Sequence, residues 1–421
     1  MKKRFYIPLL ISFSLLQFVS GLFYPVSLSN PDWYPLTSYL QNEKIILPFS
    51  SDYRFLEDGW GYLESARNFP EELGKRFTVN RPLYPFFIFL ASLPFSFFGS
   101  PSPGLIFSLA IAINLVLLCL ASILFYSLLK NLFSSRVALL SSFLFIFSPF
   151  VHTLLVQPLA EILMAFLAVI FACFIYDYFK KPSLLKLITY SLIVGILLLG
   201  KVFFAFSLFV VFLALYFRRY KEGAIFTIVH LIPLALWYLL VTRIWQIPYQ
   251  TAEVGHWGMG VWILEILSSP RLETAKAFLR SVPYFLTALF YGFFIIPVVF
   301  SFFGLQRFPF RSRKIIYFCS IVSVFILGFV ANVYAYRHAF LVFPVIYPAA
   351  VLGMERAGAF FGKDKKWLRS LFLAVIIGVL VFASNINFSK IFGFNYYGLV
   401  HWTQWPLPGF LENIFKSLNG Y

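Results

Sequence analysis

The densest group of ionisable side chains lies in a polar stretch around residue 58. Glu57 and Asp58 are adjacent acids, and Tyr62 and Ala66 follow Asp58 at intervals of four residues. A helix that begins near Asp58 would therefore carry Asp58, Tyr62 and Ala66 on one face. A carboxylate beside low-dielectric surroundings has a raised pKa and can take a proton from a hydroxyl group. Asp58 is thus a candidate general base, and capping of the helix start is its alternative role.

A second polar segment, Asn80-Arg81-Pro82-Leu83-Tyr84-Pro85, closes the same stretch. Its two prolines fix an extended or turn-like entry into the apolar helix that follows. Arg81 would then lie at the level of the lipid headgroups. Its guanidinium could bind phosphate oxygens in a fixed fork, and an arginine that merely extends toward water is the alternative.

Further ionisable residues interrupt apolar segments or the short turns between them. Glu161 begins an apolar run, Lys201 lies within the apolar stretch 195–211, and Arg337 and His338 occupy a short turn. An ionisable group inside a membrane costs about 2.5–3.5 kcal/mol unless it faces a cavity or a partner. These residues are therefore candidates for the lining of a polar cavity. Their alternatives are a helix-start charge for Glu161 and interfacial anchors for the others.

These residues must be positioned by elements that are mostly apolar. The 421 residues are 60% hydrophobic and only 12% charged, whereas a soluble domain carries about 25% charged residues. Lipid is therefore the expected solvent. The net charge of +17 fits the positive-inside bias of membrane proteins better than nucleic-acid binding. The three cysteines lie inside apolar segments, which predicts neither a disulfide framework nor a metal cluster.

Apolar runs long enough to span a membrane recur along the chain. We expect an all-α polytopic membrane protein with about eleven transmembrane helices. The runs fall at about 5–24, 103–127, 137–155, 158–179, 184–200, 202–217, 223–242, 282–305, 315–335, 338–354 and 367–385.

The orientation follows from charge. With a cytoplasmic N-terminus and no crossing at the shorter run 82–98, nearly all of the net positive charge falls on the cytoplasmic side, as the positive-inside rule requires. A crossing there would invert the asymmetry, so we expect 82–98 to be a non-crossing helix at the outer surface. Residues 1–385 then form one transmembrane domain. Its large outer segments are the loops 25–81 and 243–281, and residues 386–421 form an outer tail.

Two of these motifs resemble those of a known superfamily. The Asp-x-x-x-Tyr-x-x-x-Ala spacing from Asp58, and the Arg-Pro-x-Tyr-Pro segment from Arg81 before a short apolar helix, resemble the GT-C membrane glycosyltransferases, in particular the protein O-mannosyltransferase and aminoarabinose lipid A transferase type. The resemblance covers the topology of about residues 1–200. It implies an acid of the first outer loop at the acceptor hydroxyl, here Asp58. Many relatives carry a second acid directly after it, where this chain has Gly59. Whether a second carboxylate or a divalent metal takes part is thus open.

The function implied by the resemblance is inverting glycosyl transfer from a polyprenyl-phosphate sugar to a lipid, glycan or protein acceptor. It would occur at the periplasmic face of a bacterial inner membrane, with membrane lipids as the only other expected partners and no nucleic acid. Asp58 would be catalytic. The implied donor-phosphate ligands are Arg81, Lys201 and Arg337, and the implied cavity-lining residues are Glu57, Tyr62, Tyr84, Glu161 and His338; no metal ligands are assigned.

Two other functions use the same features. In a multi-pass transporter or lipid-linked sugar flippase, the intramembrane charges would mark a translocation path. The sequence shows no paired repeats with interrupted helices, which such transporters often contain. A polysaccharide polymerase or ligase would share the lipid-linked donor but would not share the pattern from Asp58 to Tyr84.

Overall fold

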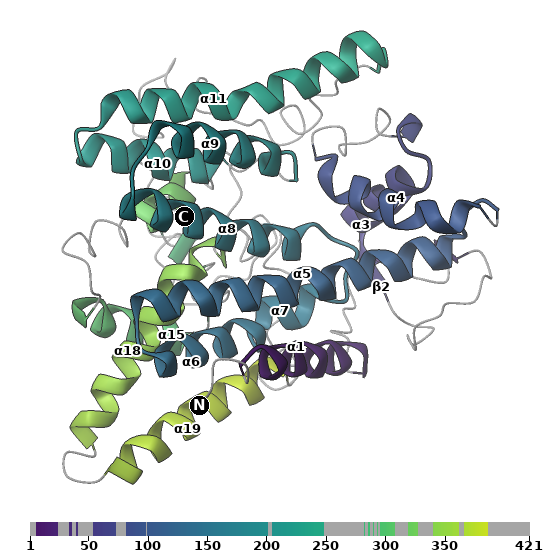
Figure 1. Ribbon diagram of the computed structural model, residues 1–421. Helices are drawn as coiled ribbons and strands as arrows, with labels where there is room; N and C mark the ends of the chain where they lie inside the picture. The colour runs from purple at the N-terminus through teal and green to yellow at the C-terminus, as the bar shows by residue number, and fades with distance from the viewer. Residues whose placement is uncertain are drawn as a thin grey trace, which may run out of the picture.

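Figure 1 shows the computed structural model of the protein, in which long helices run roughly side by side. The structure describes residues 6–23, 33–35, 39–40, 54–72, 81–97, 99–200, 204–247, 295–307, 319–326, 340–361 and 366–385, with single positions at 282, 285, 286, 289 and 293. These residues are almost entirely helical, as predicted. The exception to the all-α expectation is one short antiparallel ladder of two strands.

The elements follow one another in chain order. The N-terminal group consists of α1 (Tyr6–Phe23), β1 (Trp33–Pro35), β2 (Arg54–Leu56), α3 (Glu57–Arg67) and α4 (Leu83–Ser96). The central group consists of α5 (Pro103–Leu132), α6 (Ser135–Ile146), α7 (Pro149–Leu154), α8 (Glu161–Lys180), α9 (Leu184–Leu198), α10 (Phe204–Tyr216) and α11 (Tyr220–Leu239), which continues into a π-helical turn (Leu240–Ile244). The C-terminal group consists of α15 (Ile295–Gly304), the 3-10 turns Leu305–Arg307 and Phe340–Val342, α18 (Phe343–Phe361) and α19 (Lys366–Asn385).

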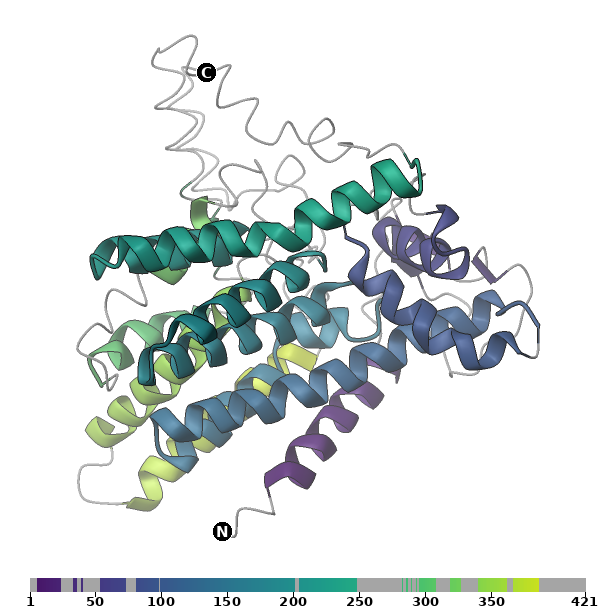
Figure 2. The same ribbon diagram turned by 45° about the horizontal axis from the view of Figure 1, so that its top comes forward.

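The longest helix, α5, passes through the middle of the molecule (Figure 2). Its start is encoded locally, because the Ser102 hydroxyl accepts a hydrogen bond from the amide of Leu105 at 3.2 Å and Pro103 occupies the first turn. Its 30 residues span about 45 Å. α5 packs against α1, α4, α6 and α8, so it connects the N-terminal elements to the rest of the bundle.

The apolar run predicted at 137–155 is not one helix. α6 ends at Ile146, and α7 begins at Pro149. The Ser148 hydroxyl accepts a hydrogen bond from the amide of Val151 at 3.2 Å, so Ser148 caps a new helix and Pro149 starts it. A serine cap followed by proline at the first position is a helix-start signal, and this local signal outweighs the continuous apolar pattern.

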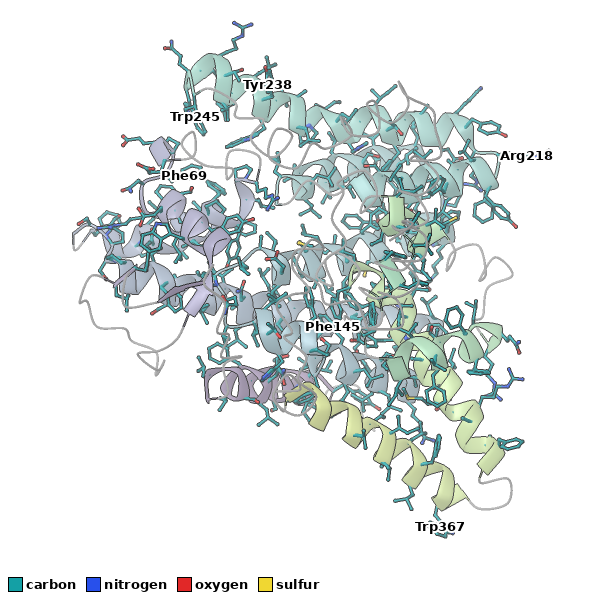
Figure 3. The ribbon with its side chains drawn as sticks, turned by 180° about the vertical axis from the view of Figure 1, so that it is seen from behind. Phe69, Phe145, Arg218, Tyr238, Trp245 and Trp367 are labelled. Atoms are coloured by element: carbon teal, nitrogen blue, oxygen red, sulfur yellow. The ribbon has the colours of Figure 1, made fainter. Side chains whose placement is uncertain are left out.

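Close helix contacts use glycine. A Cβ on Gly304 of α15 would meet the backbone of Ala349 in α18, and a Cβ on Gly353 of α18 would meet the backbone of Phe300 in α15. Small residues let membrane helices approach until their backbones touch. The start of α18 packs in an aromatic cluster around Phe145 (Figure 3), whose ring stacks on that of Phe343 with centroids 4.4 Å apart.

Four described helices are long and apolar enough to cross a membrane: Pro103–Leu132, Glu161–Lys180, Tyr220–Ile244 and Phe340–Phe360. Shorter apolar helices accompany them at Tyr6–Leu22, Leu83–Ser96, Ser135–Ile146, Leu184–Leu198 and Ser207–Tyr216. The membrane character is therefore confirmed for the described chain, and the number of about eleven spans stays a prediction. α4 has 14 residues and spans about 21 Å. That is less than the roughly 30 Å of a hydrocarbon core, which agrees with a non-crossing helix.

Candidate active site

The β1–β2 ladder leads directly into the helix that carries Asp58. The two strands are antiparallel, with Trp33 opposite Leu56, and α3 begins at the next residue, Glu57. Asp58 therefore lies in the first turn of α3, and the predicted helix start near this residue is confirmed. The side chains of Glu57 and Asp58 lie outside the described residues, so their roles stay predictions.

One face of α3 is buried against α4 and α5. Tyr62 and Ala66, which follow Asp58 at helical spacing, are 1% and 0% exposed. The ring of Tyr62 meets the ring of Tyr84 from α4 edge-to-face, with centroids 5.4 Å apart and planes at 87°. Tyr84 is also fully buried. The structure thus brings together two tyrosines that the sequence assigned to one cavity.

Arg81 lies between α3 and the start of α4. Its Nη1 donates a hydrogen bond to the Tyr62 hydroxyl at 3.5 Å, and its side chain is half-buried. Two residues later, the amide of Leu83 donates to the carbonyl of Leu199 at 3.2 Å. This backbone bond joins the segment that carries Arg81 to the end of α9. Lys201 follows Leu199 by two residues and itself lies outside the described chain.

Glu161 is the first residue of α8 and is 1% exposed. Its charge acts on Tyr84: burial raises the pKa of the Tyr84 phenol well above its ordinary value, and the negative charge of Glu161 raises it further. Tyr84 therefore stays protonated at neutral pH and serves as a hydrogen-bond donor. Glu161, predicted to line the cavity, thus lies within electrostatic reach of Tyr84.

A buried asparagine, which the sequence analysis missed, connects these parts. Asn114 of α5 accepts a hydrogen bond from the Tyr84 hydroxyl at 3.0 Å through Oδ1. Its Nδ2 donates to the carbonyl of Gln157 at 2.7 Å and to that of Leu155 at 3.4 Å. Asn114 therefore ties α4 to the segment that leads into Glu161. The signal for it was an amide inside a long apolar run, where polar side chains are costly.

Aromatic rings cover the side of this site that faces the end of α11. Phe69, which follows α3, stacks on Phe89 of α4 with centroids 5.1 Å apart. Trp245, which follows the π-helical turn, meets Phe69 edge-to-face at 6.2 Å. Figure 3 shows both rings at the same end of the molecule. The predicted outer loop 243–281 thus begins beside α3 and α4.

The remaining predicted site residues, Arg337 and His338, lie outside the described chain. Among the described residues, no three His, Cys, Asp or Glu side chains come together as a metal site. The described side chains therefore do not supply a metal-ligand set.

The described parts provide a guanidinium, a buried carboxyl group and two tyrosine hydroxyls around the first turns of α3 and α4. Such a set can hold an anionic group beside a position for proton transfer, because guanidinium pairs with phosphate oxygens and carboxylates act as bases.

Sequence comparison alone gives no relative, since no family model and no curated protein matches the chain. Solved structures do match. The apo crystal structure of the Archaeoglobus fulgidus oligosaccharyltransferase aligns with 99% of this chain at a TM-score of 0.57 and 14% identity. The oligosaccharyltransferase AglB from the same organism, in complex with an inhibitory peptide and a dolichol-phosphate, aligns with 98% of this chain at a TM-score of 0.53 and 15% identity.

The alignments cover nearly all of this chain but only part of the archaeal enzyme. This chain spans 58% of the archaeal enzyme in both structures. At this identity the likeness concerns the fold, and the archaeal enzyme is a GT-C membrane glycosyltransferase. The predicted resemblance is thereby confirmed at the level of the fold, which this chain shares with the archaeal oligosaccharyltransferase.

Proposed function

We propose that this protein is an inverting glycosyltransferase that moves a sugar from a polyprenyl phosphate to an acceptor hydroxyl group. The observation that carries the proposal is the meeting of the Arg81 segment, the buried Tyr62–Tyr84 pair and the end of α9 next to the first turn of α3. Within a GT-C fold, this arrangement supports a role for Arg81 as a phosphate-binding cation at the same end of the bundle as the candidate base Asp58.

In the proposed reaction, Asp58 takes the proton of the acceptor hydroxyl group. The acceptor oxygen attacks the anomeric carbon from the face opposite the phosphate and forms the new glycosidic bond. The bond between the anomeric carbon and the phosphate oxygen breaks, and its electron pair leaves with the polyprenyl phosphate. The configuration inverts because attack and departure occur on opposite faces.

The leaving phosphate gains negative charge, which nearby cations would stabilise. Arg81 is the described candidate, with Lys201 and Arg337 as further proposed ligands. Glu57, Tyr62, Tyr84, Glu161 and His338 would line the cavity. The archaeal neighbour is a complex with dolichol-phosphate and an inhibitory peptide, which supports a polyprenyl-phosphate donor and makes a peptide one possible acceptor beside lipids and glycans.

The proposed reaction takes place at the outer, periplasmic face of the bacterial inner membrane. The charge asymmetry of the sequence supports this orientation, because the end of the bundle opposite the site is rich in lysine and arginine. The outer loop 25–81 would bring the acceptor to Asp58.

The test uses membranes that contain the full chain, supplied with labelled polyprenyl-phosphate sugars. We expect a labelled product with the wild type and a loss of at least ~100-fold with Asp58→Asn, a typical effect for a catalytic acid or base. Glu71→Gln is the matched control, because Glu71 is an exposed acid just after α3 and should keep full activity. An Asp58→Asn protein that folds and transfers at the wild-type rate would refute the role of Asp58.

The transporter alternative predicts a different result. A flippase or transporter would move its substrate into vesicles without forming a glycosidic bond. The fold of the archaeal oligosaccharyltransferase favours the transferase.

A further inference from the structure

Four helix ends meet at the end of the bundle opposite the candidate site. They are the C-terminal ends of α8 and α10 and the N-terminal ends of α9 and α11. We call this region the basic end, and it is defined by Lys180, Lys181, Lys186, Arg218, Arg219 and Lys221. Figure 3 shows Arg218 at the far side of the molecule from Phe69.

A cavity of about 60 Å³ lies between these four helices. Side chains from each helix line it, among them Phe174 of α8, Tyr190 of α9, Val210 of α10 and Phe226 of α11. The rings of Phe174 and Tyr190 stack with centroids 4.4 Å apart and planes at 1°. A cavity of this size exceeds the space for a water molecule, and apolar cavities stay dry and accept apolar guests. The cavity therefore suits a hydrocarbon chain.

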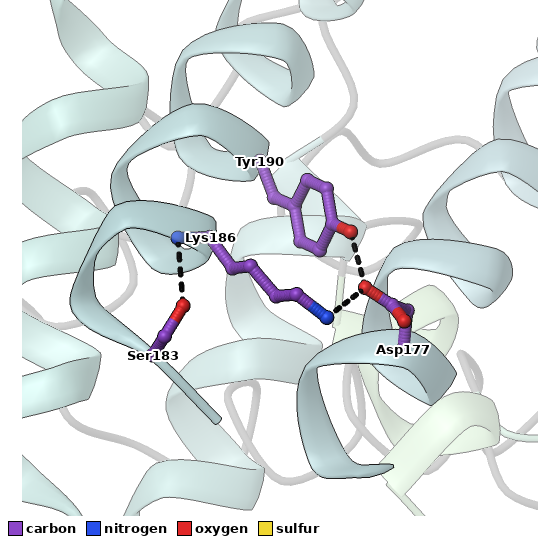
Figure 4. Close-up of polar contacts among 4 residues, drawn as sticks. All are labelled: Asp177, Ser183, Lys186 and Tyr190. Atoms are coloured by element: carbon purple, nitrogen blue, oxygen red, sulfur yellow. Dashed lines mark hydrogen bonds and ion pairs between the residues drawn. The ribbon is translucent and has the colours of Figure 1, made fainter. Parts of the chain in front are cut away.

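The two acids of the basic end, Asp177 and Glu222, are each paired with a cation of this region. Asp177 accepts from Lys186 at 2.6 Å, and the Tyr190 hydroxyl donates to the same carboxylate oxygen (Figure 4). Glu222 accepts from the Tyr178 hydroxyl at 2.6 Å and pairs with Arg219 at 3.0 Å. Each carboxylate thus has one cation and one tyrosine.

Basic side chains outnumber acidic side chains at the basic end. The four helix ends carry six basic and two acidic side chains, an excess of four positive charges, and Arg219 and Glu222 line the cavity itself. The exposed cations are Lys180, Lys181, Arg218 and Lys221. Large apolar side chains beside them are also exposed, among them Leu185 at 76% and Tyr220 at 59%. Exposed apolar groups interleaved with cations match the boundary between hydrocarbon and headgroups.

From this arrangement we infer that the basic end binds an anionic phospholipid, with part of one acyl chain in the cavity and the phosphate headgroup on the exposed cations. Basic pockets between helices attract anionic lipids, since each lysine or arginine near the surface contributes to binding. The apolar lining of the cavity explains why the acyl chain of the lipid lies there. The excess of positive charge explains why the headgroup is anionic. This site is separate from the glycosyl-transfer site and does not depend on the proposed reaction.

The headgroup part is tested by native mass spectrometry of the full chain in neutral detergent. The protein is titrated with phosphatidylglycerol or with phosphatidylcholine that carries the same acyl chains. We expect tighter binding of phosphatidylglycerol, and about tenfold weaker binding of it after the double change Lys181→Gln with Lys221→Gln. The matched control is Arg136→Gln with Arg307→Gln, two exposed cations on other helices, which should leave the binding unchanged.

The acyl-chain part is tested by filling the cavity. Val210→Phe should weaken the binding of both lipids by about tenfold, because it removes the space for roughly two methylene groups. Ala214→Leu, at a second lining position, gives the same test if Val210→Phe does not fold.

Three results would overturn the inference. The first is equal binding of the two lipids by the wild type. The second is an equal loss in the test and control charge variants. The third is displacement of phosphatidylglycerol by a polyprenyl phosphate at equal concentration, which would assign the cavity to the donor lipid.

Discussion

The two ends of the bundle hold their charges in different ways. At the basic end, Asp177 and Glu222 each have a cation at 3.0 Å or less together with a tyrosine hydroxyl. At the site end, the guanidinium of Arg81 donates to a neutral phenol, Tyr62, at 3.5 Å. The buried Glu161 acts electrostatically on Tyr84, which packs against Tyr62.

This difference shows which charges can respond to a substrate. A carboxylate that is already paired with a cation gains little from a further charge, and such pairs near the surface contribute little stability. A guanidinium binds phosphate oxygens in a fixed fork, and Arg81 carries one beside the first turns of α3 and α4. The site end therefore suits charge that develops during a reaction, and the paired charges of the basic end are structural.

Among the changes that compare the two ends, the largest effect should come from Arg81. We expect Arg81→Gln to lower the transfer rate by about 100-fold, because it removes a charge-assisted hydrogen bond to the leaving phosphate. The measurement is transfer of label from the polyprenyl-phosphate sugar in membranes. Arg67→Gln serves as the control, since Arg67 is an exposed arginine at the end of α3. If both variants transferred at the wild-type rate, the proposed contrast between the two ends would fail.

The second effect concerns the fold around the site. Asn114→Leu removes one of the two acceptors of the Tyr84 hydroxyl, which keeps the carbonyl of Ala110 at 3.2 Å. It also removes the donor to the carbonyls of Gln157 and Leu155. We expect the free energy of unfolding to fall by about 2 kcal/mol, because buried polar groups lose their partners. Unfolding in mixed micelles, followed by tryptophan fluorescence, measures this. Ser122→Ala is the control on the same helix, since the Ser122 hydroxyl donates to the carbonyl of Leu118 within α5. If Ser122→Ala lowered the free energy of unfolding by as much as Asn114→Leu, Asn114 would have no special role in joining the helices.

Local patterns in the sequence predicted several features of the fold and of the candidate site. The start of α3 near Asp58, the shared helix face of Tyr62 and Ala66, and a short apolar helix after Arg81 follow from helical spacing and proline positions. The break at Ser148 was also encoded locally, by a capping serine before Pro149. The apolar pattern continues across this break, because α6 and α7 are both apolar, and it therefore concealed the capping signal of Ser148 and Pro149.

Contacts between distant segments could not be derived in this way. The hydrogen bond from Asn114 to Gln157 joins residues 43 positions apart, and the bond from Leu83 to Leu199 joins α4 to the end of α9. Neither contact leaves a periodic signal, since each depends on how whole helices pack. The β1–β2 ladder, likewise, joins two strands that are too short for an alternating pattern.

The smallest effect should come from the basic end. Arg219 pairs with Glu222 at 3.0 Å, and both side chains are more than a third exposed. We expect Arg219→Gln to change the free energy of unfolding by less than about 1 kcal/mol, because water screens such pairs, and to leave glycosyl transfer unchanged. Unfolding in mixed micelles and transfer in membranes test the two parts. Because Glu222 keeps its bond from the Tyr178 hydroxyl at 2.6 Å, the carboxylate remains hydrogen-bonded in this variant. A transfer rate that fell as far as in Arg81→Gln would mean that the paired charges act on the reaction, and the distinction between the two ends would not hold.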